Sequence, residues 1–212
     1  ARGAASTLLD WLGFEDVDRD GNEKVIAATP EEIPGYILTR FADTYGRCVA
    51  FAFKGNRAGK TGDEVYFRVE ELKRSLNFHL LESGVAYPTF YSQLFPDIRR
   101  AMAEAVGGAR QCGRGVWAKD LTLSGFNVPG SVEAVQESAY ILPKLYRRLT
   151  DYFALNGGDT ALDGFREWLN ENDDRVLILP EGHQTSLDQA VDVDGQRVKL
   201  TTLIENLIFE EK

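Results

Sequence analysis

The stretch RFADTYGRCVAFAF, residues 40–53, joins a polar turn to a strand with alternating apolar residues. Asp43, Tyr45, Gly46 and Arg47 stand in the turn, which we expect to connect strands at about residues 35–41 and 47–53 as a β-hairpin. Arginine is the side chain best suited to hold a phosphate with two parallel hydrogen bonds. The pattern therefore predicts a hairpin and makes Arg47 a candidate phosphate-binding residue.

Helices are predicted on both sides of this hairpin. Residues 3–12 place apolar side chains on one helical face, and residues 70–83 do the same with a stripe of leucines. A third helix at residues 96–111 has Pro96 in its first turn and Gly113 just past its end. The part of the chain up to about residue 118 is thus expected to mix helices with a hairpin.

The sequence after residue 118 indicates a linker and a second structural region. Residues 119–132 contain SGFNVPGS, which is typical of a linker, so we predict a domain at 1–118 and an α+β extension at 133–212. The extension should hold helices at about residues 138–155 and 160–171 and a β-rich tail. In the tail, Asp194-Gly195 is expected to be the two-residue turn of a second hairpin. The predicted fold class is α+β.

Composition limits the class of protein. The 212 residues carry a formal net charge of −9, with 43% hydrophobic and 27% charged residues, as in ordinary globular proteins. No apolar run approaches the roughly 18 to 20 residues that cross a bilayer, so no membrane partner is expected. Two cysteines, Cys48 and Cys112, suggest reduced thiols and a cytoplasmic location rather than a disulfide framework.

The acidic total also bears on nucleic-acid partners, because non-specific binding of nucleic acid rests on Lys and Arg. A broad, sequence-independent DNA binder is disfavoured, and a small or single-stranded substrate is favoured. Residues 97–119 are nevertheless locally basic, with five cationic residues against Asp97 and Glu104. This segment is expected to be a solvated helix face, with a nucleic-acid face as the less favoured alternative.

Other motifs give weaker candidate sites. The run DVDRDGNEKVIA, residues 16–27, opens like a calcium-binding loop but has Ala27 where a bidentate carboxylate is needed, so a solvated turn is favoured. His79 and His183 have no nearby Cys or His companions for a zinc site. Cys48 is interpreted as a small core residue rather than a nucleophile. The aromatic residues near Tyr87 are equally compatible with a base-stacking platform and with a loop packed into the core.

Four segments, taken in order, resemble the staphylococcal (micrococcal, thermonuclease-like) nuclease family over about residues 1–118. DTYGR and its apolar strand are similar to the family's D-x-Y-G-R turn and strand. SLNFHLLESGVAYP is similar to its helix with an Asn near the start and a G-x-A-Y ending. DIRRAMAEAVGGARQCGRGVW is similar to its last helix, and GAASTLLDWL falls where the family has the helix before the D-x-Y-G-R region.

This resemblance implies a five-stranded OB barrel with three helices and calcium-dependent hydrolysis of phosphodiester bonds in DNA or RNA. By the same resemblance Arg47 would be catalytic and would stabilise charge on the phosphoryl oxygens. Tyr45 would donate a hydrogen bond to a terminal phosphate, Tyr87 would bind beside the nucleotide, and Tyr91 would supply a second aromatic group of the pocket. The expected ligand is therefore a nucleic acid.

The chain departs from the family at its start. In the family, three strands that precede the first helix carry the metal-binding Asp residues, a second Arg and the general-base Glu, whereas this chain begins at that helix. Neither D-G-D-T nor R-L-x-x-x-D-x-x-E occurs in it. We therefore expect residues 1–118 to form an incomplete nuclease-like OB barrel that needs a missing N-terminal segment of the same protein as its partner. The calcium ligands would lie in that segment, outside this chain, and the chain alone would be inactive. An intact-mass measurement tests this expectation. The alternative is a non-catalytic, nuclease-like binding or scaffold module.

Overall fold

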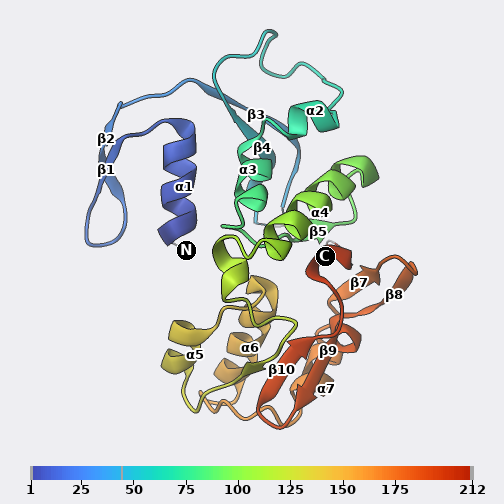
Figure 1. Ribbon diagram of the computed structural model, residues 1–212. Helices are drawn as coiled ribbons and strands as arrows, with labels where there is room; N and C mark the ends of the chain where they lie inside the picture. Colours follow the sequence, from blue (N-terminus) through green and yellow to red (C-terminus); the bar gives the residue numbers. More distant parts are fainter. Residues whose placement is uncertain (1, 44, 211–212) are drawn as a thin grey trace.

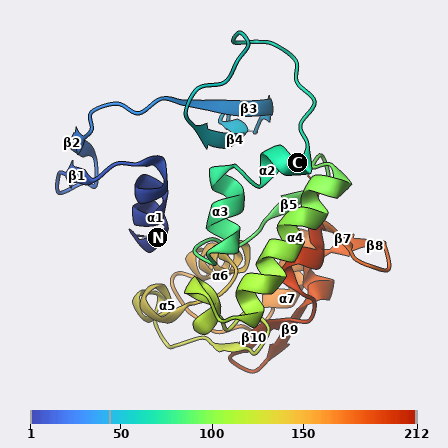
Figure 2. The same ribbon diagram turned by 45° about the horizontal axis from the view of Figure 1, so that its top comes forward.

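The computed structural model describes residues 2–43 and 45–210 (Figure 1). Helix α1 (Arg2–Leu12) opens the chain and is followed by a hairpin of β1 (Asp16–Arg19) and β2 (Val25–Thr29). A second hairpin consists of β3 (Gly35–Ala42) and β4 (Cys48–Lys54). The β1–β2 hairpin lies to one side of the molecule in both views, away from the C-terminal half (Figure 1 and Figure 2). The sequence predicted α1 and the β3–β4 hairpin but not the first hairpin.

The β3–β4 hairpin has an irregular register near its turn. Its strands are antiparallel, and Thr39 pairs with Ala50 whereas Phe41 pairs with Val49, so Arg40 is an extra residue in β3. Such a β-bulge bends the strand and changes the direction of nearby side chains. The turn end of the hairpin therefore does not follow the simple alternation of the rest.

Two short helices replace the single helix predicted at residues 70–83. Helix α2 (Val69–Leu72) ends before Ser75, and α3 (Leu76–Glu82) begins after it. The buried Ser75 hydroxyl accepts a hydrogen bond from the Phe78 N–H at 3.1 Å, which is the geometry of an N-cap. This serine starts a new helix, whereas the leucine stripe suggested one continuous helix. Helix α4 (Pro96–Gln111) has the predicted bounds.

After α4, the described residues form three more α-helices and the strands of two sheets, one of which also includes β5. The 3-10 turn η1 (Gly115–Ala118) leads into α5 (Val132–Ser138), α6 (Pro143–Leu155) and α7 (Phe165–Glu171). Because Pro143 occupies the first turn of α6, that helix begins later than the predicted residue 138. In the first sheet the strand order is β6-β10-β9, and in the second it is β5-β11-β7-β8.

These strands are short and join distant parts of the chain. They are β5 (Phe90–Tyr91), β6 (Phe126–Asn127), β7 (Arg175–Ile178), β8 (His183–Ser186), β9 (Val191–Asp194), β10 (Arg197–Leu200) and β11 (Leu207–Phe209), with 3-10 turns η2 (Leu187–Ala190) and η3 (Ile204–Asn206). The β9–β10 hairpin is present as predicted. Because Asp194 pairs with Arg197, its two-residue turn is Gly195-Gln196 and not Asp194-Gly195.

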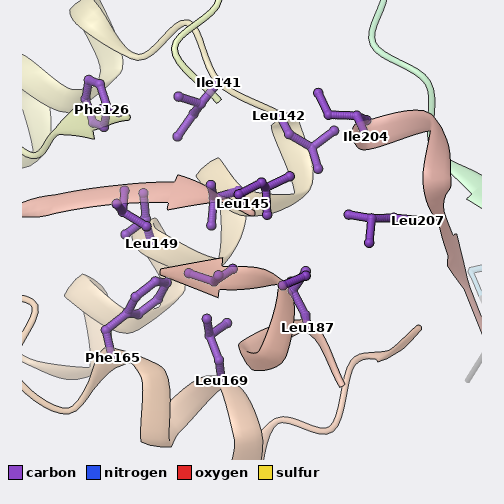
Figure 3. Close-up of a cluster of buried hydrophobic side chains, with 14 of the residues drawn as sticks. Phe126, Ile141, Leu142, Leu145, Leu149, Phe165, Leu169, Leu187, Ile204 and Leu207 are labelled. Atoms are coloured by element: carbon purple, nitrogen blue, oxygen red, sulfur yellow. The ribbon is translucent and has the colours of Figure 1, made fainter. Parts of the chain in front are cut away.

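A large hydrophobic core extends from the end of α3 to β11. Figure 3 shows its centre, where side chains from α6, α7 and the neighbouring strands converge, among them Leu142, Leu145, Leu149, Phe165 and Leu169. A smaller cluster of Leu72, Phe78, Ile98 and Ala101 joins α2, α3 and α4, with Phe51 and Phe67 packed against it. Burial of these side chains is the main favourable term for the fold.

Residues 119–132, predicted to be a linker, are partly packed into the large core. Thr122, Phe126 and Val128 are buried there, and the Leu121 N–H donates to the Tyr140 carbonyl oxygen at 2.8 Å. Small polar residues and glycine in this segment suggested a linker, but its apolar side chains face the core. The segment is therefore part of the packed core and is less exposed than its composition indicated.

The α+β class is confirmed, and the finer prediction of a nuclease-like barrel stays a prediction. The described residues form two two-stranded sheets, one three-stranded sheet and one four-stranded sheet, and none of these sheets closes into a barrel. Across residues 2–43 and 45–210, no helix is both long and apolar enough to cross a membrane.

Candidate functional site

The DTYGR turn is organised by the carboxylate of Asp43. Its Oδ1 accepts hydrogen bonds from the backbone N–H groups of Tyr45 and Arg47, both at 2.9 Å. Its Oδ2 accepts a hydrogen bond from Arg47 Nε at 2.6 Å. Asp and Asn commonly hold tight turns in this way because their short side chains reach the backbone two to four residues on. The first residue of the turn therefore positions its last.

These bonds stabilise the charged form of Asp43. The backbone N–H of Arg47 is the largest cause that lowers the pKa of this carboxyl below its ordinary value of 3.8, and the Arg47 guanidinium lowers it further. Asp43 is thus a carboxylate at neutral pH, and it keeps one edge of the guanidinium occupied. Within the described residues the two Nη groups of Arg47 make no hydrogen bond, and 73% of its side chain is exposed.

An aromatic ring lies beside this guanidinium. The Arg47 Cζ atom is 4.9 Å from the centroid of the Tyr45 ring, a distance typical of a cation–π contact. The Tyr45 residue is 78% exposed. The turn therefore presents a cation with free N–H groups and an aromatic surface next to each other, which is the combination that binds a phosphate and a neighbouring base.

The other two predicted site residues belong to the C-terminal core. The Tyr87 hydroxyl donates to Asp120 Oδ1 at 2.7 Å, and its ring meets the Trp117 ring edge-on at 5.2 Å. Burial, followed by the hydrogen bond to Asp120, raises the pKa of Tyr87. Tyr91 lies in β5, pairs with Phe209 of β11, and its ring is 6.3 Å from that of Phe209. Among the described residues, no hydrogen bond, ion pair or ring contact joins these two tyrosines to Tyr45 or Arg47.

Arg40, which was not among the predicted site residues, connects the hairpin to the segment that follows Tyr91. Arg40 Nη1 donates to the Gln93 carbonyl oxygen at 3.3 Å, and its Cζ atom lies 4.5 Å from the centroid of the Phe95 ring. Gln93 and Phe95 follow Tyr91 in sequence. The contact joins residues 53 positions apart, so only the presence of an arginine close to the turn could have drawn attention to it.

The remaining sequence candidates have structural roles. Asp20 Oδ1 accepts hydrogen bonds from the N–H groups of Asn22 and Lys24, both at 2.9 Å, so the Asp-rich run is a hairpin turn, as favoured. His79 lies on α3 with its ring 6.0 Å from Trp11. No group of three or more His, Cys, Asp or Glu that could hold a metal ion occurs in the described part of the chain.

The interpretation of Cys48 as a core residue is wrong. Both Cys48 and Cys112 are free and exposed, and the Cys48 thiol donates to Thr39 Oγ1 at 3.0 Å. The apolar strand pattern indicated burial, but the described residues do not cover the hairpin at this end. Neither cysteine takes part in a disulfide.

Comparisons with known proteins do not assign this site to a family. No family model, curated protein or solved structure matches the chain. The resemblance to the staphylococcal nuclease family is therefore a prediction from sequence.

Proposed function

We propose that this chain is the phosphate-binding part of a nuclease-like protein that hydrolyses phosphodiester bonds in DNA or RNA. The observation that carries the proposal is the Asp43–Arg47–Tyr45 arrangement. Asp43 fixes the guanidinium by Nε and leaves both Nη groups open beside an exposed ring. An arginine held in this way loses little conformational freedom when it binds a phosphate.

In this proposal Arg47 supplies one part of the chemistry. Its two Nη groups would hold the phosphoryl oxygens and stabilise the negative charge that grows on them in the transition state. The Tyr45 hydroxyl would donate to a terminal phosphate. A calcium ion would polarise the phosphate and a Glu would activate water, and we expect the ligands and the base to come from residues outside this chain.

Binding is the first test. Fluorescence anisotropy with an end-labelled oligothymidylate measures the Kd of the full chain and of Arg47→Ala. Loss of a charged hydrogen-bonded contact is expected to weaken binding by about tenfold or more. The matched control is Arg175→Ala, because Arg175 is also an exposed arginine, paired by Nε with Asp173 at 3.1 Å, and the variant loses the same charge. Equal effects of the two substitutions would contradict a specific site at the turn.

Cleavage is the second test and separates the enzyme from the non-catalytic binding module. Denatured DNA is incubated with calcium and the chain, with Arg47→Ala as the comparison. We expect binding without cleavage by this chain alone, and calcium-dependent cleavage when strands that carry Asp ligands and a Glu base are fused before residue 1. Binding that persists without cleavage in this fusion would favour the non-catalytic binding module. Cleavage that survives Arg47→Ala would contradict the assignment of Arg47.

A further inference from the structure

A second arginine–aromatic pair lies close to the first. Arg40 covers one face of the Phe95 ring with its guanidinium at 4.5 Å, much as Arg47 lies against Tyr45 at 4.9 Å. Phe95 directly precedes helix α4 and is nevertheless 51% exposed. A large apolar ring in contact with a cation and still open to solvent is an unusual use of a phenylalanine, because burial of such a ring is favourable.

The bulge in β3 gives Arg40 its position. Arg40 is the extra residue between the Thr39–Ala50 and Phe41–Val49 pairs, so its side chain leaves the regular alternation and reaches the segment after β5. Its bond to the Gln93 carbonyl oxygen, at 3.3 Å, is long for an N–H···O hydrogen bond. The guanidinium is thus placed by its ring contact while several of its N–H groups make no bond within the described residues.

The distance between the Arg40–Phe95 pair and the Arg47–Tyr45 pair matches the spacing of nucleotides in a nucleic-acid strand. Arg40 is two residues before Ala42, which pairs with Cys48, the neighbour of Arg47. At a strand rise of about 3.3 Å per residue, the two arginines are about 10 Å apart along the hairpin. A stacked nucleic-acid strand advances about 3.4 Å per nucleotide, so this separation spans about three nucleotides, or fewer when the strand is extended.

Local charge favours the same ligand. Residues 35–54, which contain the hairpin, carry Arg40, Arg47 and Lys54 against one acidic residue, Asp43, in a chain whose net charge is −9. Asp43 is already paired with Arg47. A polyanion is therefore attracted to this hairpin and repelled by much of the remaining surface.

We propose that a single-stranded nucleic acid lies along the turn end of the β3–β4 hairpin, with Arg47 and Arg40 each binding a phosphate and Tyr45 and Phe95 each stacking a base. This two-point site rests on the proposed function and extends it from one phosphate to a strand of several nucleotides. Bases stack on protein rings only when they are unpaired and exposed, so duplex DNA gains the phosphate contacts but not the stacking.

The competing interpretation is that Arg40 only ties the hairpin to the segment after β5. Two probes separate these roles: thymidine 3′,5′-bisphosphate, which is too short to reach both arginines, and an oligothymidylate of about eight nucleotides, within the length that small single-strand binding sites cover. Affinities are measured for the full chain by competition and by fluorescence anisotropy. The variants are Arg40→Ala, Arg40→Lys, Phe95→Leu and Arg47→Ala, with Arg175→Ala as the control.

We expect Arg40→Ala to weaken oligothymidylate binding by about tenfold and to leave bisphosphate binding unchanged. Loss of one phosphate contact should also reduce the slope of log K against log salt by about 0.7, and Arg40→Lys should restore that slope because it keeps the charge. Phe95→Leu should weaken the oligothymidylate by about fivefold or more without changing the slope, because only stacking is lost. A duplex of equal length should bind more weakly than the single strand.

The outcomes distinguish the two proposals. If Arg47→Ala weakens both probes while Arg40→Ala changes neither the oligothymidylate affinity nor the salt slope, the two-point site is wrong and the proposed phosphate site stands. If Arg40→Ala weakens both probes equally, Arg40 supports the turn without touching a second phosphate, and the two-point site is again overturned. If Arg47→Ala has no effect on either probe, the proposed function itself fails.

Discussion

The parts of the chain before and after Val69 are stabilised in different ways. Among the described residues before Val69, Phe53 is the only hydrophobic side chain that is buried, whereas the later part holds both hydrophobic clusters. The earlier part is held by hydrogen bonds within turns and hairpins, and Val25, Ile26 and Ile37 are largely exposed there. Isolated hairpins have little stability in water, so the candidate site lies in the less stable region.

A few contacts hold the β3–β4 hairpin to the rest of the molecule. Phe51 and Phe53 of β4 meet the Phe67 ring at 4.7 and 6.3 Å. Arg40 reaches Gln93 and Phe95, as described above. The position of the hairpin therefore depends on contacts with Phe67 and with the segment between β5 and α4, whereas the hydrogen bonds of its turn join the turn's own residues.

Truncation of a buried side chain should give the largest difference in stability between the two regions. Leu145 of α6 is fully buried, so Leu145→Ala should lower the free energy of unfolding by about 2 to 5 kcal/mol, through lost transfer energy and the cavity left behind. Ile37 of β3 is 55% exposed, and Ile37→Ala should change the stability by less than about 0.5 kcal/mol. Urea unfolding followed by circular dichroism measures both. A comparable loss at Ile37 would show that the hairpin is packed as tightly as the core.

The buried ion group at Asp174 should give the next largest effect. The Asp174 carboxylate accepts hydrogen bonds from Arg148 Nε and, at 2.8 Å, from Arg148 Nη2, and Lys144 Nζ lies 3.3 Å away. Asp174→Asn removes the negative charge that Lys144 and Arg148, both partly buried, share, and leaves Arg148 only its contact with the more exposed Asp151 at 3.1 Å. We expect a loss of about 3 kcal/mol at pH 7 in urea unfolding. Asp173→Asn is the control, because Asp173 and Arg175 form an exposed pair, which contributes about 1 kcal/mol or less.

The same carboxylate gives a pH dependence with a defined sign. Burial raises the pKa of Asp174, but the hydrogen bonds from Arg148 and the charge of Lys144 outweigh burial, and the net shift is downward from 3.8. A carboxyl whose folded pKa is lowered contributes stability above its unfolded pKa, near 3.9, and loses it as the pH falls through the folded value. The stability gap between the wild type and Asp174→Asn should therefore be constant near neutral pH and shrink below about pH 4. A gap that stays constant into acid would contradict this assignment.

Local patterns were sufficient to predict the elements that local residues determine. The turn between β3 and β4 was predicted because Asp43, Gly46 and the alternating strand lie within a few positions of one another. Helix α4 was predicted because Pro96 marks its start. The β1–β2 hairpin was missed because its strands are mostly exposed and polar and show no clear alternation.

Features that depend on distant contacts could not be predicted in this way. The pairing of β5 with β11 joins residues more than a hundred positions apart, and it places Tyr91 against Phe209. For the site, the sequence indicated Tyr45 and Arg47, which share one turn, but the contact between Arg40 and Phe95 requires the bulge and the folded position of the β5–α4 segment. The hydrogen bond from the Arg47 backbone N–H to Asp43 could have been predicted from the sequence, because Asp at the start of a turn commonly accepts from backbone N–H groups.

A smaller effect is expected where the hairpin meets α3. The Asn77 side chain bonds the backbone of β4 at two points: Oδ1 accepts from the Ala52 N–H at 3.0 Å, and Nδ2 donates to the Ala50 carbonyl oxygen at 3.2 Å. This amide covers backbone groups of β4 in the manner of a neighbouring strand. Asn77→Ala should cost about 1 kcal/mol and speed hydrogen exchange at the Ala52 amide, with little change in α6.

Hydrogen exchange observed by NMR measures the Asn77 prediction residue by residue. Asn77→Asp is the informative companion variant, because it keeps an acceptor for Ala52 and loses the donor to Ala50. Exchange at Ala52 should then stay slower than in Asn77→Ala. If both variants leave the Ala52 amide unchanged, the hairpin is held by its ring contacts with Phe67 and not by this side chain.

The smallest expected effect is a shift in the pKa of Asp43, which tests whether the DTYGR turn keeps its shape without the Arg47 side chain. NMR titration of the Asp43 side chain should give a midpoint below the ordinary value of 3.8, because the backbone N–H of Arg47 is the main cause of the lowered pKa. Arg47→Ala removes the guanidinium but keeps that N–H, so the midpoint should rise and still remain below 3.8. A return to the ordinary value would mean that the ion pair holds the carboxylate and that the turn depends on the same side chain that is proposed to bind phosphate. A midpoint that stays low would show that the turn keeps its shape independently, so that Arg47→Ala tests binding without disturbing the loop.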